Sequence, residues 1–309
     1  MSKKVLITGA SGFIGSRLVL KSKMRGYEVI ATSRAPSKSL EKELSTKIFP
    51  LDLLDKDQTK DFNMYADTIV HTATANDIVS KDATKGIDLS VNGTINLLEL
   101  ANRLKVKNLI FISTLQVYGQ ELEGTYNEKS PLNCQSSYAL NHFLGEEICR
   151  YYFKKNGINV LILRPSNIFG VPDSKSINRS TLVPICFVKE ILTYGKINMK
   201  SSGKQTRNFI SNDQLSNIIL SLIGSFPKGL NYINAVSNYN EEIRTVAELT
   251  KDIYFNNFQK KTSISYTSDS PVKGNKFIIK SAVDKKQTND SKKELSETIE
   301  MLFKLFGAD

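Results

Sequence analysis

Tryptophan is absent from the 309 residues, and the chain contains only three cysteines and eight prolines. Cys134, Cys149 and Cys186 are too few and too scattered for a disulfide scaffold or a metal knuckle, and their odd number suits a reducing compartment. We expect ordinary packing roles for them and no metal site. Because 40% of the residues are hydrophobic, disordered and collagen-like classes are excluded as well.

Long hydrophobic runs are also missing. No apolar segment approaches the roughly 20 residues that span a bilayer, and the apolar start of the chain is too short for a signal peptide. We therefore expect a soluble, cytoplasmic protein without a membrane partner. The net charge of +11 is spread over lysine pairs that alternate with acids. Since no basic stripe emerges, a solvated surface is favoured over nucleic-acid binding.

Short apolar runs alternate with amphipathic segments through the first half of the chain. Runs that are apolar throughout are typical of strands buried on both faces. They occupy residues 5–8, 29–32, 48–51, 68–71, 109–112 and 160–163. Between them, apolar residues in 91–104 recur at helical spacing. This alternation, with right-handed crossovers, predicts an α/β fold with a doubly wound parallel sheet.

A glycine-rich segment, residues 8–15 (TGASGFIG), follows the first expected strand and opens a helix. Gly9 permits a tight turn, Gly12 lets the backbone approach a pyrophosphate, and Gly15 allows the helix to pack closely on the strand. The context predicts a Rossmann-type dinucleotide site; the alternative is a glycine turn that packs two elements without a ligand. The contacts predicted from this segment are Gly9, Ser11, Gly12, Phe13, Ile14 and Gly15.

The rhythm of strands and helices breaks after about residue 170, with loops expected near 171–180 and 201–207. We interpret 1–170 as an NAD(P)-binding Rossmann domain and 171–309 as mainly a smaller, C-terminal substrate-binding lobe. A return segment near 209–236 is expected to bring residues 232–236 back to the main sheet as a strand. The lysine-rich stretch 256–293 is weakly patterned.

The end of the second expected strand carries Ser33 and Arg34. An NAD enzyme usually has an acid there for the ribose hydroxyls, whereas a hydroxyl and a guanidinium can bind a 2′-phosphate. NADP(H) is therefore favoured, with NAD(H) as the other candidate. In the alternative, Arg34 stacks on adenine or points to solvent. Asp52 ends the third strand, where it either meets the adenine amino group or remains solvated.

A strand expected to end at Ser113 and Thr114 is followed, 24 residues after Thr114, by Tyr138 on a predicted helix that also carries His142. Here the sequence resembles the extended short-chain dehydrogenase/reductase family, in its NAD-dependent epimerase/dehydratase group, which acts on nucleotide sugars. The resemblance runs from about residue 4 to 236. Besides the glycine loop and the tyrosine helix, it includes 71–73 (HTA), 92–99 (NGTINLLE), 113–119 (STLQVYG), 164–170 (RPSNIFG) and 203–210 (GKQTRNFI).

The resemblance implies that Tyr138 donates and accepts the proton at the sugar carbon that exchanges hydride with nicotinamide, and that Thr114 hydrogen-bonds the same oxygen. Asn167 and Arg207 match positions that contact a substrate diphosphate; as an alternative, Arg207 is a surface salt-bridge partner. The further cofactor contacts implied are Asp52, Leu53, Thr72, Ala73, Asn92, Tyr138, His142 and Pro165. The helices at 91–104 and 138–153 pair across a two-fold axis in the family, so a homodimer is expected.

One position departs from the family pattern Tyr-x-x-x-Lys, because His142 stands where the lysine belongs. The lysine's fixed charge lowers the tyrosine pKa from about 10 toward the working pH, whereas a histidine is only partly charged near neutrality. Either His142 is a weaker catalytic substitute that acts as imidazolium and holds the cofactor ribose, or the chain binds a nucleotide without turning it over. We favour retained catalysis, because Tyr138 and Thr114 are intact.

Dehydratases of this family carry an Asp-Glu pair directly after the threonine, where this chain has Leu115 and Gln116. Neither side chain can act as an acid or base, so a 4,6-dehydratase is disfavoured. We expect a keto-sugar reductase or a 4-epimerase whose partner is a nucleotide-diphosphate sugar. The alternatives are a non-catalytic nucleotide-binding regulatory protein and a reductase of a non-nucleotide carbonyl.

Overall fold

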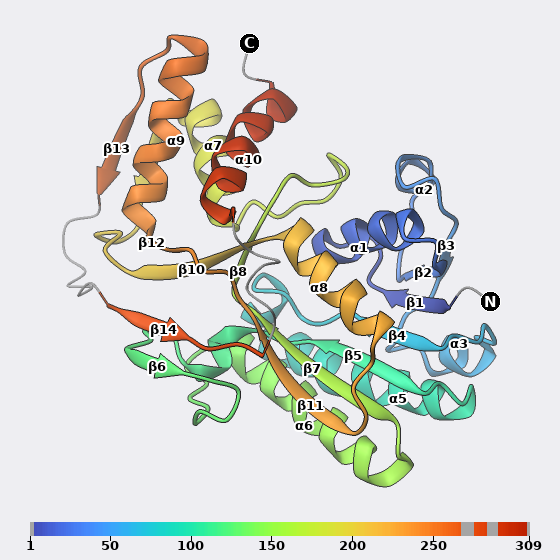
Figure 1. Cartoon of the computed structure of the whole chain (residues 1–309). Helices are drawn as coiled ribbons and strands as arrows, with labels where there is room; N and C mark the ends of the chain where they lie inside the picture. Colours follow the sequence, from blue (N-terminus) through green and yellow to red (C-terminus); the bar gives the residue numbers. More distant parts are fainter. Residues whose placement is uncertain (1–2, 267–274, 283–289, 308–309) are drawn as a thin grey trace.

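The computed structural model describes residues 3–266, 275–282 and 290–307. Its largest element is a seven-stranded sheet with the order β11-β7-β5-β4-β1-β2-β3 (Figure 1). Every neighbouring pair is parallel. The strands are β1 (Lys4–Thr8), β2 (Glu28–Ser33), β3 (Ile48–Pro50), β4 (Thr68–His71), β5 (Asn108–Ile112), β7 (Asn159–Pro165) and β11 (Leu230–Ala235). The predicted parallel sheet is confirmed, and each of the six apolar runs forms a strand.

Helices cover both faces of this sheet (Figure 1). Along β1, Val5 and Ile7 pack in one hydrophobic cluster with α1 (Phe13–Met24) and α8 (Asn212–Gly224). Leu6 points to the other face and packs in a second cluster. That cluster includes α5 (Gly93–Arg103) and α6 (Ser137–Asn156). Burial on both faces explains why the strands are apolar without alternation.

The smaller helices of the first half lie beside the strand ends. They are α2 (Lys38–Glu43), α3 (Lys56–Asp61) and α4 (Ala83–Ile87), with 3-10 turns at Val79–Lys81 and Leu115–Tyr118. The helix expected at 91–104 begins one turn earlier, in a π-helical turn at Asp88–Asn92 that runs directly into α5. Helix α6 starts at an N-cap, Ser136, whose hydroxyl accepts from the Ala139 amide.

A second group of elements stands above the carboxyl ends of the strands (Figure 1). Three helices pack together there, α7 (Val183–Tyr194), α9 (Ile243–Phe258) and α10 (Ser291–Phe306). Small sheets flank them, in the orders β12-β10-β8, β13-β9 and β14-β6. Their strands are β6 (Gly124–Tyr126), β8 (Asn167–Phe169), β9 (Lys196–Met199), β10 (Thr206–Ser211), β12 (Asn240–Glu242), β13 (Ser263–Tyr266) and β14 (Phe277–Ile279).

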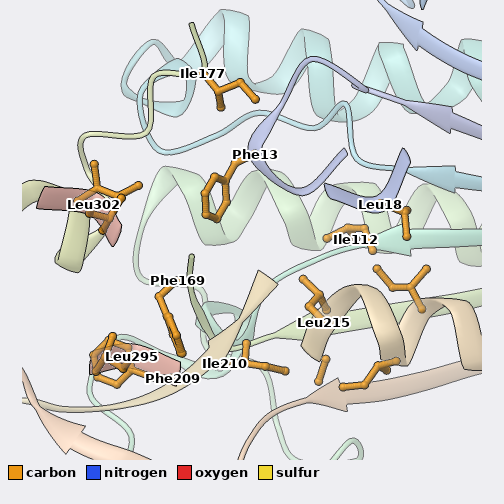
Figure 2. Packing of buried hydrophobic residues seen from close by; sticks show 14 of the residues in the cluster. Phe13, Leu18, Ile112, Phe169, Ile177, Phe209, Ile210, Leu215, Leu295 and Leu302 are labelled. Atoms are coloured by element: carbon orange, nitrogen blue, oxygen red, sulfur yellow. The ribbon is translucent and has the colours of Figure 1, made fainter. Parts of the chain in front are cut away.

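One hydrophobic core joins the sheet to this second group. Figure 2 shows Phe13 of α1, Phe169 of β8 and Phe209 of β10 near Leu295 and Leu302 of α10. All five side chains are buried. The lobe is therefore packed against the Rossmann sheet rather than tethered to it.

The return segment is present in the structure. Helix α8 covers the main sheet, and β11 pairs with β7 in parallel, so the strand expected at 232–236 forms at Leu230–Ala235. The segment 256–293 contains β13 and β14, and parts of it lie outside the described residues. The division into domains at residue 170 stays a prediction.

The cysteines and the lengths of the apolar helices bear on the expectations drawn from composition. The three cysteines are free thiols, and Cys149 is buried in the cluster beneath α5 and α6. Within the described ranges, no helix is long and apolar enough to cross a membrane.

Candidate functional site

A cavity of about 820 Å³ opens at the carboxyl ends of the parallel strands, beneath the second group of elements. This edge of a doubly wound sheet is where ligands bind in such folds. The predicted site residues that line the cavity are Gly9, Ser11, Gly12, Phe13, Ile14, Gly15, Ser33, Arg34, Asp52, Leu53, Thr72, Ala73, Thr114, Tyr138, His142, Pro165 and Asn167. Asn92 lines neither this cavity nor the smaller one described below, because it is exposed on the π-helical turn.

The glycine loop has the geometry that its three glycines permit. Gly9 has φ +71°, and a Cβ there would lie 2.9 Å from the Ala73 nitrogen. A Cβ on Gly15 would lie 2.2 Å from the Gly9 carbonyl oxygen, so α1 approaches the loop more closely than any side chain allows. Gly12 caps α1, and its amide donates to the Gly9 carbonyl at 2.8 Å. The loop and the helix N-terminus together form a cradle that fits a pyrophosphate.

Two residues mark the end of the cavity next to β2. Ser33 is buried, and its hydroxyl lies 2.7 Å from the Ser11 hydroxyl. The Arg34 guanidinium is exposed and makes no hydrogen bond or ion pair with any residue that the structure describes. Asp52 is half-buried, and one of its carboxylate oxygens accepts from the Leu54 amide at 3.0 Å. Arg34 is thus available to an anionic ligand at this end.

The expected catalytic pair comes together at the opposite end. Thr114 follows β5 and caps the turn at Leu115–Tyr118, while Tyr138 lies in the first turn of α6. Both side chains line the large cavity. Burial raises the pKa of Tyr138 and the Asp77 carboxylate raises it further, whereas the Arg179 charge and the Thr114 hydrogen bond oppose the shift. The net effect is a raised pKa, so the phenol holds its proton at neutral pH.

His142 lies one turn further along α6 and is 3% exposed. Its ring packs edge-on against Tyr138, with the ring centroids 4.6 Å apart, and also faces Phe111. Burial lowers the pKa of His142 to about 4, although a hydrogen bond with the Ile112 backbone opposes the shift. The partial charge expected of His142 near neutrality is therefore wrong, because the ring is neutral at that pH. A neutral ring cannot supply the charge of the family lysine.

A second, smaller cavity of about 270 Å³ holds the residues expected to bind a diphosphate. Asn167 and Arg207 both line it, and it shares Leu115, Gln116 and Asn167 with the large cavity. The Asn167 amide donates to the Asn208 carbonyl at 3.0 Å, which fixes the side chain against β10. The structure therefore places Arg207 and Asn167 together, next to Thr114.

Sequence reasoning missed four charged residues of the large cavity, Asp77, Lys85, Asp88 and Arg179. Two of them, Asp77 and Arg179, form an ion pair. Asp77 follows β4, and Arg179 lies in the loop between β8 and α7. A guanidinium nitrogen, Nη1, lies 3.2 Å from the Asp77 Oδ1 atom. No motif signals this pair, because its members are distant in sequence and both lie in segments without regular structure.

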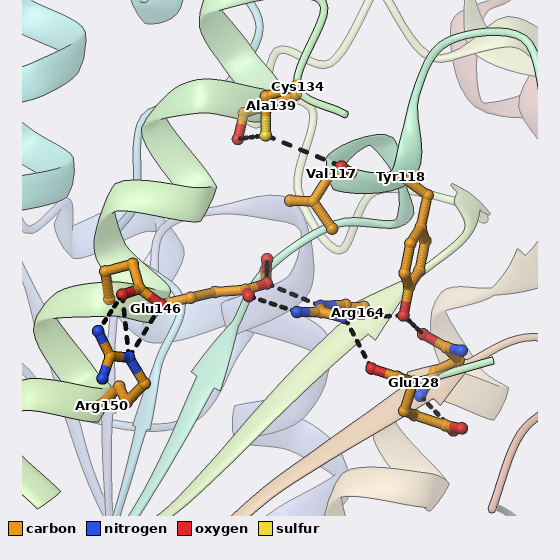
Figure 3. Close-up of polar contacts among 11 residues, drawn as sticks. Val117, Tyr118, Glu128, Cys134, Ala139, Glu146, Arg150 and Arg164 are labelled. Atoms are coloured by element: carbon orange, nitrogen blue, oxygen red, sulfur yellow. Dashed lines mark hydrogen bonds and ion pairs between the residues drawn. The ribbon is translucent and has the colours of Figure 1, made fainter. Parts of the chain in front are cut away.

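A buried polar network centred on Arg164 and Glu146 joins several elements of the main sheet and α6 (Figure 3). The Arg164 guanidinium of β7 donates to both Glu146 oxygens, at 2.9 and 2.6 Å, and to the Tyr118 hydroxyl at 2.7 Å. Glu146 also accepts from Ser113 at 2.5 Å, and Tyr118 donates to Asn234 of β11 at 2.9 Å. The network therefore joins β5, α6, β7 and β11 around one ion pair.

The cavity fits a dinucleotide on two independent observations. The glycine cradle has no room for side chains at Gly9 and Gly15, and the buried Nδ1 atom of His142 has no hydrogen-bond partner within the described residues. A ligand hydroxyl would satisfy that nitrogen. By contrast, no group of three or more His, Cys, Asp or Glu side chains among the described residues could hold a metal ion.

Comparisons with known proteins agree with this geometry. The model of the NAD dependent epimerase/dehydratase family matches residues 5–233. A putative UDP-glucose 4-epimerase of Methanocaldococcus jannaschii is 29% identical over 212 residues, which cover 67% of this chain and 68% of that protein. A dTDP-4-dehydro-6-deoxy-D-allose reductase of Streptomyces is 25% identical over 244 residues, which cover 73% and 74%.

A solved structure gives the same result for the fold. The dTDP-glucose 4,6-dehydratase of Streptomyces venezuelae, crystallised with NAD bound, superimposes with a TM-score of 0.82. The alignment covers 98% of this chain and 97% of that one, at 20% sequence identity. The likeness shows that the two chains share a fold.

Proposed function

Because the chain belongs to the NAD dependent epimerase/dehydratase family, we propose that it transfers hydride to or from a nucleotide-activated sugar, as a keto-sugar reductase or a 4-epimerase. The observation that carries the proposal is that Thr114 and Tyr138 line the same cavity as the glycine cradle. A dinucleotide site beside a proton donor is the minimum that such a reaction needs.

Different residues of the cavity would bind different parts of a dinucleotide. When bound, a nicotinamide dinucleotide supplies or accepts the hydride. The N-terminus of α1 and the Gly12 backbone receive the phosphates, and the Nδ1 atom of His142 meets a ribose hydroxyl. Arg34, free at the outer end, favours a 2′-phosphate and hence NADP(H). The structurally similar dehydratase was crystallised with NAD, so NAD(H) is the competing cofactor.

Tyr138 and Thr114 handle the proton. When hydride adds to the carbonyl carbon, the C=O π bond would break and its electron pair would move to the oxygen, which becomes an alkoxide. The Tyr138 hydroxyl would give that oxygen its proton and be left as phenolate. Thr114 holds the oxygen by a hydrogen bond. In the opposite direction, the phenolate takes the proton of the alcohol. Because the pKa of Tyr138 is raised, the protonated form dominates at neutral pH and favours reduction.

Dehydration finds no support in the residues after Thr114. Leu115 is buried and apolar, and Gln116 lies between the two cavities without an ionisable group. A dehydratase needs an acid for the leaving hydroxyl and a base for the neighbouring proton. We therefore keep the proposal of a reductase or epimerase, although a dehydratase has the same fold.

The competing candidate is a nucleotide-binding regulatory protein that performs no chemistry, and the observation that favours it is the neutral His142. One experiment separates the two. Purified protein is analysed by mass spectrometry for a dinucleotide carried through purification, and is then assayed against a panel of nucleotide-diphosphate keto sugars and 4-hydroxy sugars. Turnover of one panel member supports the proposal, whereas bound dinucleotide with no turnover supports the regulatory role.

A further inference from the structure

The neutral His142 leaves the site without the positive charge of the family lysine, and Arg179 is a second candidate for that charge. Arg179 lines the cavity together with Tyr138 and His142, and its side chain is 19% exposed. The ion pair with Asp77 holds one end of the guanidinium, while its buried Nε atom has no hydrogen-bond partner within the described residues. A guanidinium stays charged at every pH at which proteins are folded. Arg179 therefore brings a permanent cation into the cavity.

The other cations that line the cavity are placed differently. Lys85 pairs with Asp82 at 3.1 Å, and its side chain is 77% exposed. Arg34 is exposed at the end next to β2. Solvent screens such exposed charges, whereas a charge that is mostly buried acts more strongly on its neighbours. Of the three, Arg179 is the most buried, so its charge is the least screened by solvent.

The loop that carries Arg179 is anchored on both sides of it. Before it, Asp173 accepts from Ser16 at 2.9 Å and pairs with Arg17 of α1 at 2.8 Å. After it, the Leu182 amide donates to the Arg179 carbonyl at 3.0 Å, just before α7 begins. Together with the Asp77 contact, these anchors fix the guanidinium against the Rossmann sheet.

We propose that Arg179 is a positioning residue that takes over the electrostatic role of the absent lysine: fixed by Asp77, it presents a permanent positive charge to the Tyr138 hydroxyl from the loop between β8 and α7. The inference rests on the proposed function, in which Tyr138 exchanges the proton. It differs from the family arrangement in that the charge comes from the lobe and not from the tyrosine's own helix.

The groups that face Tyr138 support this assignment. His142 on α6 is neutral, the Thr114 side chain after β5 lowers the Tyr138 pKa, and Asp77 after β4 is the opposing charge. Arg179 is the strongest influence that lowers the Tyr138 pKa against the effect of burial. Asp88 and Lys85 line the wall of the cavity further out. The charge that Asp77 carries is thus compensated by Arg179 at a distance of 3.2 Å.

The test measures ionisation of Tyr138 directly. Protein labelled with ¹³C at the tyrosine ζ carbon is titrated by NMR, with Tyr138→Phe to assign the resonance. Arg179→Met should raise the pKa of Tyr138 by about one pKa unit or more. Arg179→Lys should keep it near the wild-type value, because the charge remains. His142→Gln should leave it unchanged, and so should Lys85→Met, the matched loss of a cation that lines the same cavity.

Each outcome decides the proposal. If Arg179→Met or Arg179→Gln folds normally by circular dichroism and leaves the Tyr138 pKa at the wild-type value, Arg179 has no such role. The same conclusion follows if His142→Gln raises the pKa as much as Arg179→Met does. The titration needs no substrate, so an enzyme inactive against every nucleotide sugar would contradict the proposed function while the assignment of Arg179 is still decided.

Discussion

At the scale of single residues, the chain has two histidines, and both are buried and neutral. His71 lies between Thr8 and Thr94, with its Nδ1 atom 2.8 Å from the Thr8 hydroxyl. Burial, with a smaller contribution from His142, lowers its pKa to about 3. His142 occupies the other side of Phe111. Neither histidine is therefore cationic at neutral pH.

The lowered pKa values of the two histidines predict how stability depends on pH. Both histidines have folded-state pKa values below the ordinary 6.5, so the unfolded chain binds more protons as the pH falls below that value. The free energy of unfolding should therefore decrease from about pH 6.5 toward 4, by up to about 1.4 kcal/mol per pH unit for each histidine. Urea denaturation at several pH values measures the slope. His142→Gln should make it shallower, and an unchanged slope would contradict the burial argument.

Arg34 governs the choice between the two nicotinamide cofactors. If its free guanidinium binds a 2′-phosphate, Arg34→Ala should weaken NADPH binding by roughly tenfold or more and leave NADH binding almost unchanged. Fluorescence of the reduced cofactor follows both titrations, and the absence of tryptophan removes one background signal. Lys38→Ala, an exposed cation just beyond β2, is the control. Equal affinity of the wild type for both cofactors would reject the preference.

At the scale of elements, the strands were predictable and the lobe was not. The sheet strands are short and apolar because both faces are covered, and this pattern is local in the sequence. The glycine loop is likewise local. Helix α10, by contrast, begins at Ser291, at the end of the weakly patterned segment, and buries Leu295 and Leu302 against distant parts of the chain. Such packing depends on tertiary contacts that periodicity does not report.

The same distinction applies within the candidate site. Tyr138 and Thr114 were found because they belong to motifs at fixed spacing. Asp77 and Arg179 meet only through the fold, at 3.2 Å, from two irregular segments. The partial charge expected of His142 was wrong for a related reason: its sequence position gives no measure of its burial beside Phe111.

The ion pair of Arg164 and Glu146 is predicted to hold four elements of the sheet in place. Both side chains are nearly inaccessible, at 3% and 1% exposed. Arg164→Met would leave the Glu146 carboxylate buried without its partner, at a cost of about 3 to 5 kcal/mol in the free energy of unfolding. Chemical denaturation measures this loss. Arg150→Met, which removes a more exposed pair with Glu147, should cost less than about 1 kcal/mol. Similar losses for the two variants would contradict the structural role of the network.

At the scale of the whole molecule, the cavity lies between the Rossmann sheet and the lobe that packs on its carboxyl edge, and residues of both parts line it. Tyr138 and the glycine cradle come from the sheet side, while Arg179 comes from the loop that leads into the lobe. The smaller cavity, which Arg207 lines, meets the large cavity at Leu115, Gln116 and Asn167, directly after Thr114 in the chain.

The outer surface of α6 predicts an assembly. Leu140 and Tyr151 are 42% and 56% exposed there, on a helix that pairs across a two-fold axis in the family that this chain resembles. We expect light scattering to give about twice the 34.6 kDa mass of the chain at micromolar concentration. Tyr151→Lys should shift the protein toward the monomer, whereas Met24→Lys, at an exposed site on α1, should not. A wild-type monomer would reject the homodimer.

The central claim is that Tyr138 delivers the proton during hydride transfer to a nucleotide-bound keto sugar. The measurement that tests it most directly is the rate of NADPH or NADH oxidation with the active member of the keto-sugar panel, for wild type, Tyr138→Phe and the exposed control Tyr194→Phe. We predict that Tyr138→Phe lowers kcat at least about 100-fold with unchanged cofactor affinity, while Tyr194→Phe retains wild-type activity. Full activity of Tyr138→Phe would contradict the account.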